Sequence, residues 1–530
     1  MANANQATEF LTWDDTVIIS ENPLVKDGLT IENVLLALQA ETLNLWHPMT
    51  LWSHQLDVSL FGLNPDLHHL SALLYHLLAG LALYFALLQL KAPPSSNSAR
   101  NRSPVVSKAV ALYTTLLFLL HPMHVESWAW LAERKDTLSA LFAFLTLNYW
   151  ARFNQAPVNS RSSKFNYALS LLFLACGLLS KPSMVVWPAV LFLTTHLQNP
   201  RPQLKEHLPT IKLLLPHLLL CVCTAVITYL LQLGRGEETL QVIATRPLHQ
   251  NLVVGFNNLW IYFYKVFYPS PLSYFYEPLK TYPFTGGALG FSLFLILTHF
   301  SWKLRQSFPL LLWAWGSFVI VLGPVCGFMV SGEANAPDRY SYLAYTGPFL
   351  LLTVLASKCF QLLNLTTQKY KLILSSLAAI ILISLTFLSA KRAADWKSME
   401  TLTTAAIESH PNSYAPHHHI ASVYLAQNQI QKARYHIERT LALREGNRFL
   451  WSQLGIIEHQ EGNSNLAQKH FLKQLVHSPN NLHAHVGLAK IYLETNDFLA
   501  ALPHLEKASE LVPENMAYAL ALKQCREAIE

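Results

Sequence analysis

Long apolar stretches, each close to the length that crosses a lipid bilayer, recur along this chain between residues 70 and 390. Ten of them are candidate membrane spans, and they begin near Leu70, Lys108, Thr137, Asn166, Met184, Ile211, Gly286, Phe308, Ser341 and Leu372. An eleventh stretch, 251–268, carries Asn257, Asn258 and Lys265 and is a candidate interfacial or re-entrant helix instead. The pattern predicts a polytopic membrane helix bundle.

Charged residues in the connecting loops predict how this bundle is oriented. Loops 91–108 and 152–164 are basic and contain no acid, and 201–212 continues the pattern on an alternate loop. The intervening loops mix both signs. By the positive-inside rule the basic loops face the cytoplasm. If 251–268 does not span, the alternation places the N-terminal segment and the tail after Lys391 outside the cytoplasm.

The tail repeats with a period of 34 residues, the length of the tetratricopeptide motif. One unit has the residues typical of this motif at the expected spacings, namely Trp451, Leu454, Gly455, Ala467, Phe471 and Pro479. The units before and after it follow the same pattern, and Pro411 implies a partial leading unit. The pattern predicts an α-solenoid of stacked helix pairs, whose concave surface binds peptides.

The fold class predicted for the whole chain is therefore all-α, a membrane helix bundle followed by a tetratricopeptide-repeat α-solenoid. We expect a first extracytoplasmic loop at 1–69, a membrane domain at 70–392 and the repeats at 393–530. Only 13% of the residues are charged, about half the share in a soluble domain, which agrees with a membrane protein. The net charge is +6, but no basic run is interleaved with aromatics, so nucleic acid is not an expected partner. The six cysteines lack CxxC spacing and indicate neither a disulfide framework nor a metal site.

An acidic pair, Asp14 and Asp15, lies on the N-terminal segment that we expect outside the cytoplasm. Two adjacent carboxylates repel each other, which raises the pKa of one of them and suits it to act as a general base. Adjacent acids are also common as N-caps and turn residues, and spacing alone favours that structural role. The pair is a candidate catalytic site with a structural alternative.

The loop after the second apolar stretch holds another cluster. His121, His124 and Glu126 offer metal ligands, but their spacing matches no standard site, and hydrogen-bonded histidines at a helix end are the favoured alternative. Arg134 and Lys135 follow on the same outward loop, against the positive-inside preference.

Two further cations, Lys181 and Arg339, are expected on the same outer face as Arg134 and Lys135. Four cations at loop edges suit an anionic lipid headgroup or a sugar phosphate. Ion pairs with neighbouring acids such as Glu133 explain Arg134 and Lys135 equally well.

Several loop strings resemble one known family. They are TWDDTVIISENPLV, NLWHPMTLWSHQLDVSLFGL, HPMHVESWAWLAERKDTLSALF, LLSKPSMVVWP and APDRYSYL. In this order, and followed by the repeats, they resemble the transmembrane-and-tetratricopeptide-repeat O-mannosyltransferases and their bacterial relatives. The resemblance runs over about residues 10–530. It implies the fold of the GT-C glycosyltransferase superfamily, and transfer of mannose or a similar sugar from a polyprenyl-phosphate carrier to an acceptor hydroxyl, often on a protein.

The resemblance also implies roles for individual residues. The family's acidic pair is the usual candidate for the catalytic base, a role that maps onto Asp14 and Asp15. Its basic loop residues bind the lipid phosphate, which suggests Arg134, Lys135, Lys181 and Arg339. We expect the site to be supported by His47, His124, Glu126, Asp136 and Asp338. Neither a metal nor a cofactor is expected besides the lipid-linked sugar donor.

Further expectations concern partners and location. The partners implied are the polyprenyl-phosphate sugar, membrane lipids, and an acceptor protein or peptide held by the repeats. The location implied is the bacterial inner membrane or the endoplasmic reticulum, with the acidic loop and the repeats extracytoplasmic. Family members also carry a transmembrane helix ahead of the acidic pair, and the printed sequence begins downstream of that expected helix.

Two other functions stay open at this point. A transporter or flippase needs paired charges or Gly/Pro breaks at mid-membrane, for which His76, His217 and the Gly323-Pro324 break are weak candidates. A non-catalytic membrane scaffold or assembly factor would need only the repeats. The identity of the sugar, the carrier and the acceptor does not follow from the sequence.

Overall fold

The computed structural model describes residues 8–43, 45–91, 104–200, 206, 208–233, 247–277, 283–328, 335–362, 368–444, 450–513 and 515–529. In these residues the regular secondary structure is helical, apart from two isolated β-bridges. The chain forms two compact units, Met1–Ser398 and Met399–Glu530, which divide close to the predicted start of the repeats. The predicted all-α class is confirmed.

The first unit begins with short helices whose ends are encoded locally. They are η1 (Thr16–Ser20), α1 (Pro23–Lys26), α2 (Ile31–Ala37) and α3 (Pro48–Phe61). The Asn22 side chain caps α1 by accepting a hydrogen bond from the backbone N–H of Leu24, and Thr30 caps α2 in a similar way. Helix α3 ends at Gly62, whose φ of 61° suits a residue without a side chain.

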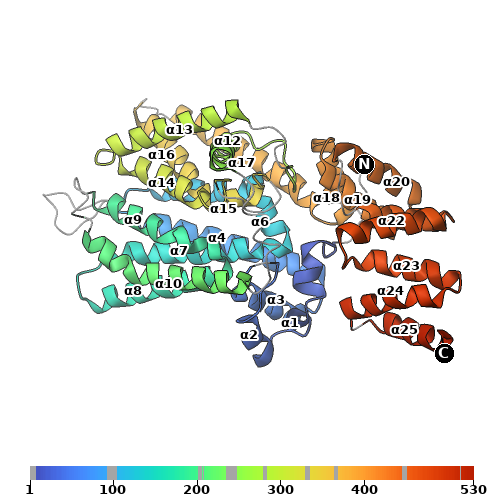
Figure 1. Ribbon diagram of the computed structural model, residues 1–530. Coiled ribbons are helices and arrows are strands. Elements are labelled where there is room, and N and C mark those ends of the chain that lie inside the picture. The colour runs from blue at the N-terminus through green and yellow to red at the C-terminus, as the bar shows by residue number, and fades with distance from the viewer. Residues whose placement is uncertain are drawn as a thin grey trace. The chain divides into compact units, whose positions relative to one another are not determined.

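The remaining helices of the first unit form the apolar bundle (Figure 1). The longer ones are α4 (Pro65–Leu88), α5 (Lys108–Leu120), α7 (Arg134–Phe153), α8 (Arg161–Ser180), α9 (Trp187–Gln198), α10 (Leu208–Leu233), α12 (Leu248–Lys265), α13 (Phe284–Lys303), α14 (Pro309–Leu322), α16 (Thr346–Leu362) and α17 (Gln368–Asp395). Short turns of helix join some of them, namely η2 (Pro122–His124), α6 (Val125–Ala129), η3 (Leu131–Glu133), η4 (Pro182–Val186), η6 (Asp338–Tyr340) and α15 (Ser341–Ala344).

Several helices of the bundle pack closely against one another. Helix α7 packs against both α4 and α8, and α14 packs against α9 and α16. Helices α12 and α13 form a close hairpin, in which a Cβ atom on Gly290 would lie 1.8 Å from the carbonyl oxygen of Phe256. Only glycine permits that approach of the two backbones.

Five of the described helices are long and apolar enough to span a membrane: α4, α8, α10, α13 and α17. The pair Asp338–Ala344 and Thr346–Leu362, bent by 58°, counts as a sixth if it is one span. Helices α5 and α14 are apolar but short, at 13 and 14 residues. At about 1.5 Å per residue they reach about 20 Å, against about 30 Å of bilayer hydrocarbon.

The ten predicted spans are thus only partly recovered. The stretches near Lys108 and Phe308 form the short α5 and α14, and the one near Ser341 is the bent pair. The stretch near Met184 is divided between η4 and the 12-residue α9, while the one near Thr137 forms α7, which carries charges at both ends. Turns and charged residues divide apolar runs that look continuous in composition. The basic segments 92–103 and 201–205 lie outside the described residues.

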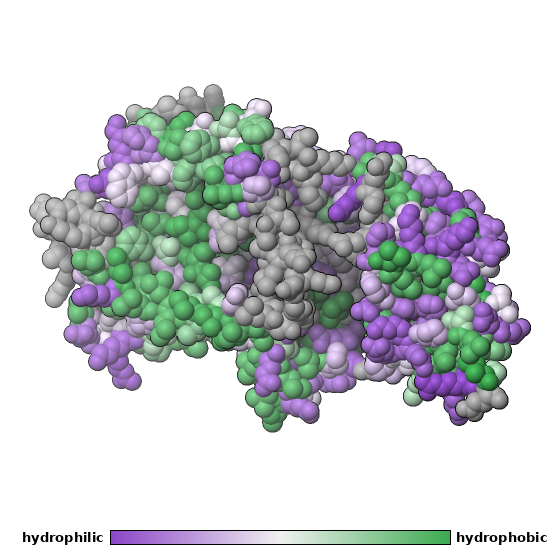
Figure 2. All heavy atoms as spheres, viewed as in Figure 1, coloured by the Kyte–Doolittle hydropathy of each residue, from purple (hydrophilic) through white to green (hydrophobic). Residues whose placement is uncertain are grey.

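Apolar side chains cover much of the visible outer surface of this bundle (Figure 2). Helix α10 exposes a continuous set of them, namely Leu215, Leu219, Val222, Val226 and Leu230. Proteins surrounded by water rarely expose so large an apolar surface, whereas lipid-facing helices do. The chain is a multi-pass membrane protein.

The second unit consists of helices packed as successive hairpins (Figure 1). They are α18 (Met399–Ser409), α19 (Tyr414–Ala426), α20 (Ile430–Leu443), α21 (Leu450–Gln460), α22 (Ser464–His477), α23 (Leu482–Glu494), α24 (Phe498–Leu511) and α25 (Met516–Ile529). Helices α20, α22 and α24 begin 34 residues apart, so the period of the sequence is also the period of the helices. Buried Phe471 fills the space beside Gly455 and Gly487, where an added Cβ would lie 2.6 and 2.3 Å from its ring. Assignment of the hairpins to the tetratricopeptide class stays a prediction.

Candidate active site

The acidic pair lies where the N-terminal segment meets the turn between α6 and α7. Asp15 is 0% exposed, and its carboxylate accepts backbone hydrogen bonds from Leu11 at 3.1 Å and from Ala132 at 2.8 Å. Trp13 stacks on Trp130 beside this junction, with ring centroids 4.9 Å apart. Burial raises the pKa of Asp15 from 3.8 to about 7, although both backbone hydrogen bonds oppose the rise. Asp15 therefore ties two distant segments together.

Asp14 has a different environment. Its side chain is half-buried, and it forms no hydrogen bond or ion pair with another residue that the structure describes. Burial raises the pKa of Asp14 above 3.8, the charges of Lys135 and Arg339 oppose this, and Glu133 adds to it. The two acids thus differ: Asp15 is held by backbone groups, whereas Asp14 keeps a free carboxyl group near two cations.

Those two cations belong to a buried network of charges. Oε1 of Glu133 lies 3.0 Å from Nζ of Lys135 and 3.2 Å from Nε of Arg339. Nη1 of Arg339 lies 2.5 Å from Oε1 of Glu126, and its backbone N–H donates to Oε2 at 3.2 Å. Burial disfavours the charge on Glu133, but the surrounding cations outweigh burial and hold its pKa below 4.5. The network holds Arg339 in place through two carboxylates.

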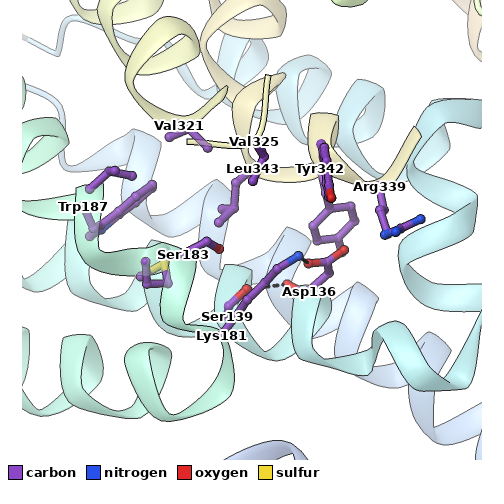
Figure 3. A pocket seen from close by; sticks show the side chains of 13 residues that line it. Asp136, Ser139, Lys181, Ser183, Trp187, Val321, Val325, Arg339, Tyr342 and Leu343 are labelled. Carbon is purple, nitrogen blue, oxygen red and sulfur yellow. Dashed lines mark hydrogen bonds and ion pairs between the residues drawn. The ribbon is translucent and has the colours of Figure 1, made fainter. Parts of the chain in front are cut away.

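Lys181 joins the same region through Asp136. Its ammonium pairs with Oδ1 of Asp136, whose Oδ2 accepts a hydrogen bond from the Ser127 hydroxyl at 3.1 Å. A pocket lies beside this pair, with Asp136, Lys181 and Arg339 among its polar lining residues (Figure 3). Its apolar lining includes Met184, Val186, Trp187, Val321, Val325 and Leu343. A charged region and an apolar wall therefore share one cavity.

Arg134 does not join the other three predicted phosphate-binding cations. Its side chain is 0% exposed, and Nη1 lies 2.5 Å from Oδ2 of Asp57. Nη1 and Nη2 also donate to the backbone carbonyls of Ser53 and His68 at 3.4 and 3.0 Å. The side chain points into the hairpin of α3 and α4, where carbonyls and a carboxylate already bind it. Arg134 and Lys135 are the first two residues of α7, and adjacent residues of a helix point in different directions. Their side chains therefore contact different partners.

Some of the predicted supporting residues lie among these charged groups, and others have a packing role. Glu126 and Asp136 belong to the charged network described above. His47 precedes α3 and is buried; burial and then the Lys135 charge lower its pKa to about 4, so the ring is neutral near the site. His124 instead packs among aromatic rings, and its Nδ1 donates to the carbonyl of Phe118 at 2.7 Å. It is therefore a buried packing histidine.

Asp338 is next to Arg339 in the chain but pairs elsewhere. Its Oδ1 accepts hydrogen bonds from Nζ of Lys265 at 3.1 Å and from the hydroxyl of Tyr276 at 2.8 Å. Neither of these partners was among the predicted site residues. The sequence did contain a signal for this pair. Lys265 lies in the otherwise apolar stretch 251–268, and a lysine buried there needs a carboxylate as its partner.

The group His121, His124 and Glu126 is not arranged as a metal site. Nδ1 of His121 accepts a hydrogen bond from the backbone N–H of Met123, His124 is bound as described, and Glu126 is paired with Arg339. In the described residues, the group of histidine, cysteine and acidic side chains close enough to hold an ion is His54, Asp57 and His68.

No protein-family profile matches the chain. Among curated proteins, it is 25% identical over 181 residues to the protein O-mannosyl-transferase TMTC1 of Mus musculus, over 32% of this chain and 18% of that protein. It is 28% identical over 141 residues to the protein of the same name from Homo sapiens, over 26% of this chain and 14% of that protein. The matched segments thus span less than a fifth of these relatives.

Among solved structures, ArnT from Cupriavidus metallidurans bound to undecaprenyl phosphate overlaps 84% of this chain and 70% of its own, at 14% identity and a TM-score of 0.32. A TM-score this low carries no structural argument. The fold and the apolar helices define a multi-pass, all-helical membrane protein. The sequence likeness makes it a distant relative of the transmembrane-and-tetratricopeptide-repeat O-mannosyltransferases, as the loop strings indicated.

Proposed function

We propose that this chain transfers a sugar from a polyprenyl-phosphate carrier to an acceptor hydroxyl, with Asp14 as the catalytic base. The observation that carries the proposal is the contrast within the acidic pair. Asp15 is buried and bound to two backbone N–H groups, whereas Asp14 is half-buried, unpaired among the described residues, and near Lys135 and Arg339. A base needs a free carboxylate that reaches substrate, and a second group that holds it in place.

The reaction balances with these groups. The acceptor O–H gives its proton to Asp14 while its oxygen bonds to the anomeric carbon, and the bond from that carbon to the carrier's phosphate oxygen breaks. The configuration at the anomeric carbon inverts because the acceptor attacks opposite the leaving group. The leaving phosphate gains negative charge, and in this proposal Lys135, Lys181 and Arg339 stabilise that charge.

The charge of the network limits how a phosphate can bind. Each of these cations already pairs with a carboxylate, namely Glu133, Asp136 or Glu126. Burial raises the pKa of Glu126, although Arg339 opposes the rise. Protonation of a raised-pKa acid would free its cation for the phosphate at little electrostatic cost. We therefore assign the phosphate to the pocket of Figure 3, where Lys181 and Arg339 are both lining residues.

The sugar, the acceptor and the carrier are assigned by analogy with the similar proteins. Their name supports mannose as the sugar and a protein as the acceptor. In this proposal the second unit presents the acceptor, and the acidic pair works on the extracytoplasmic face, in the bacterial inner membrane or the endoplasmic reticulum. The ArnT structure was solved with undecaprenyl phosphate, and a polyprenyl phosphate is the carrier class proposed here.

The test is transfer of radiolabelled sugar from polyprenyl-phosphate donors to protein in membranes that contain the full chain. Asp14→Asn should lower the transfer rate by about 10²–10⁴-fold, the usual contribution of a general base. Asp27→Asn, an exposed acid of the same segment, is the matched control and should retain activity.

Two outcomes would contradict the proposal. Full activity of Asp14→Asn would remove the base assignment. Lack of transfer by the unaltered chain from mannosyl and glucosyl donors on both dolichyl and undecaprenyl phosphate would remove the enzyme assignment. A binding role for the helical repeats would then be the better explanation.

A further inference from the structure

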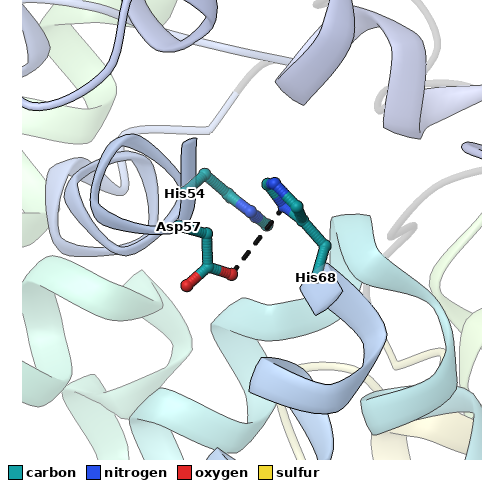
Figure 4. A group of neighbouring side chains, drawn as sticks. All are labelled: His54, Asp57 and His68. Atoms are coloured by element: carbon teal, nitrogen blue, oxygen red, sulfur yellow. Dashed lines mark ion pairs between the residues drawn. The ribbon is translucent and has the colours of Figure 1, made fainter. Parts of the chain in front are cut away.

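A second group of buried ionisable side chains lies in the hairpin of α3 and α4. His54 and Asp57 are three positions apart on α3 and therefore share a face, and His68 lies in the first turn of α4. Their exposed fractions are 0%, 2% and 0%. One ligand atom from each lies within 4.8 Å of the others. Figure 4 shows the two rings and the carboxylate gathered around a common centre.

The rings of His54 and His68 each keep at least one nitrogen without a hydrogen-bond partner among the described residues. Nε2 of His68 donates to the carbonyl oxygen of Gly62 at 2.9 Å, so the neutral ring keeps a lone pair on Nδ1. That nitrogen lies 3.7 Å from Oδ2 of Asp57. Neither ring nitrogen of His54 has a hydrogen-bond partner among the described residues. Buried polar groups left in this state normally contact an ordered water or an ion.

We propose that His54, Asp57 and His68 bind a divalent transition-metal ion of the zinc class, which joins α3 to α4. Two imidazoles and one carboxylate form a typical ligand set for such an ion. A metal-bound histidine usually donates its other N–H to a carbonyl or carboxylate, as His68 does to Gly62. Zinc bonds of about 2.0–2.2 Å require ligand atoms that now lie up to 4.8 Å apart to move closer together.

Arg134 determines how tightly the ion is held. Nη1 of Arg134 lies 2.5 Å from Oδ2 of Asp57, while the hydroxyl of Ser71 donates to Oδ1 at 2.9 Å. Oδ2 forms this ion pair without a hydrogen-bond partner among the described residues, so it keeps a lone pair that can coordinate the ion. The guanidinium charge repels a divalent ion and lowers its affinity. Nε of Arg134 is also buried, and it has no hydrogen-bond partner among the described residues.

This role is independent of the proposed sugar transfer, which needs no metal. The metal site is structural: it fixes the end of α3 against the start of α4, and so fixes the hairpin that Arg134 also enters. Metal binding of this kind adds its free energy to folding.

The test measures bound Zn²⁺ in the full chain, purified in detergent without a polyhistidine tag. The protein is treated with a chelator, equilibrated with ZnCl₂ alone, desalted and analysed by mass spectrometry of the metal. We expect His54→Leu and His68→Leu each to bind one ion per chain fewer than the unaltered protein. His76→Leu is the matched control, because His76 is also buried on α4 but its ring nitrogens bond to Tyr342 and Leu119. It should retain the ion.

Two further measurements keep the proposal testable if a histidine variant fails to fold. Arg134→Gln should bind Zn²⁺ at least about tenfold more tightly, because a neighbouring positive charge is removed. X-ray absorption at the zinc edge of the unaltered protein should show two imidazole ligands. Equal zinc content in the unaltered protein and folded His54→Leu, or a zinc spectrum without imidazole, would overturn the proposal and leave a hydrogen-bonded water cluster.

Discussion

Replacement of Asp15 by Asn is expected to change how the stability of this protein depends on pH. Asp15 is 0% exposed, and burial raises its pKa from 3.8 to about 7. The folded chain therefore favours the protonated carboxyl group. Its contribution to stability is fully present below pH 3.8 and is lost as the pH rises to about 7. At about 1.4 kcal/mol for each pH unit, the whole loss is about 4 kcal/mol.

The Asn side chain removes the titration but keeps only one of the two hydrogen bonds. Its oxygen can still accept from the N–H of Ala132, while its amide group would face the N–H of Leu11. Loss of that bond costs about 1–3 kcal/mol at every pH. Between pH 5 and pH 7, the stability of the unaltered protein should fall by about 3 kcal/mol relative to Asp15→Asn. The difference should become constant about one pH unit above the folded pKa of about 7.

Thermal unfolding in detergent, followed by tryptophan fluorescence between pH 5 and pH 8, measures this difference. Trp13 and Trp130 stack beside Asp15 and report on the junction. Asp27→Asn is the control, and its Tm should follow that of the unaltered protein at every pH. A gap between the Tm values of the unaltered protein and Asp15→Asn that stays constant from pH 5 to pH 8 would refute the burial argument.

Three other predictions follow from single contacts. Lys265→Met should lower stability by about 3–5 kcal/mol, because Asp338 then keeps a buried charge without its partner, and Asp338→Asn in the same chain should restore part of the loss in Tm. Gly290→Leu should separate α12 from α13, since even a Cβ there lies 1.8 Å from the carbonyl oxygen of Phe256, and faster hydrogen exchange in both helices would reveal it. Phe471→Ala should cost about 3–5 kcal/mol through a cavity between hairpins, measured as hydrogen exchange in α22, and unchanged exchange would contradict this packing.

Local signals accounted for much of the helical structure. The caps at Asn22 and Thr30, and the 34-residue period of the tail, involve neighbouring residues and appear as helix ends and hairpins. The number of spans was harder to predict, because composition does not show where η4 or the bend before α16 interrupts an apolar run. Hydrophobicity identifies lipid-facing stretches, whereas their interruptions depend on turns that tertiary packing stabilises.

The charged residues illustrate the same limit. Lys135, Lys181 and Arg339 were expected to gather. Lys135 and Arg339 share Glu133, while Lys181 pairs with Asp136 and lines the same pocket as Arg339. Arg134 was expected with them, but its side chain pairs with Asp57 and with backbone carbonyls of Ser53 and His68 instead. A sequence shows which charged residues lie in an apolar chain. It does not show which partner each of two adjacent side chains contacts.

The sequence by itself determined the all-helical class, the apolar character of the bundle and the period of the tail, because these depend on short-range patterns of residue type. Only the tertiary structure distinguished Asp14 from Asp15, since their difference depends on the N–H group of Ala132, 117 residues away. Only the tertiary structure brought His54, Asp57 and His68 together, because that contact depends on how α3 folds back on α4. Burial and long-range hydrogen bonds, which the tertiary structure sets, give identical residue types different chemistry.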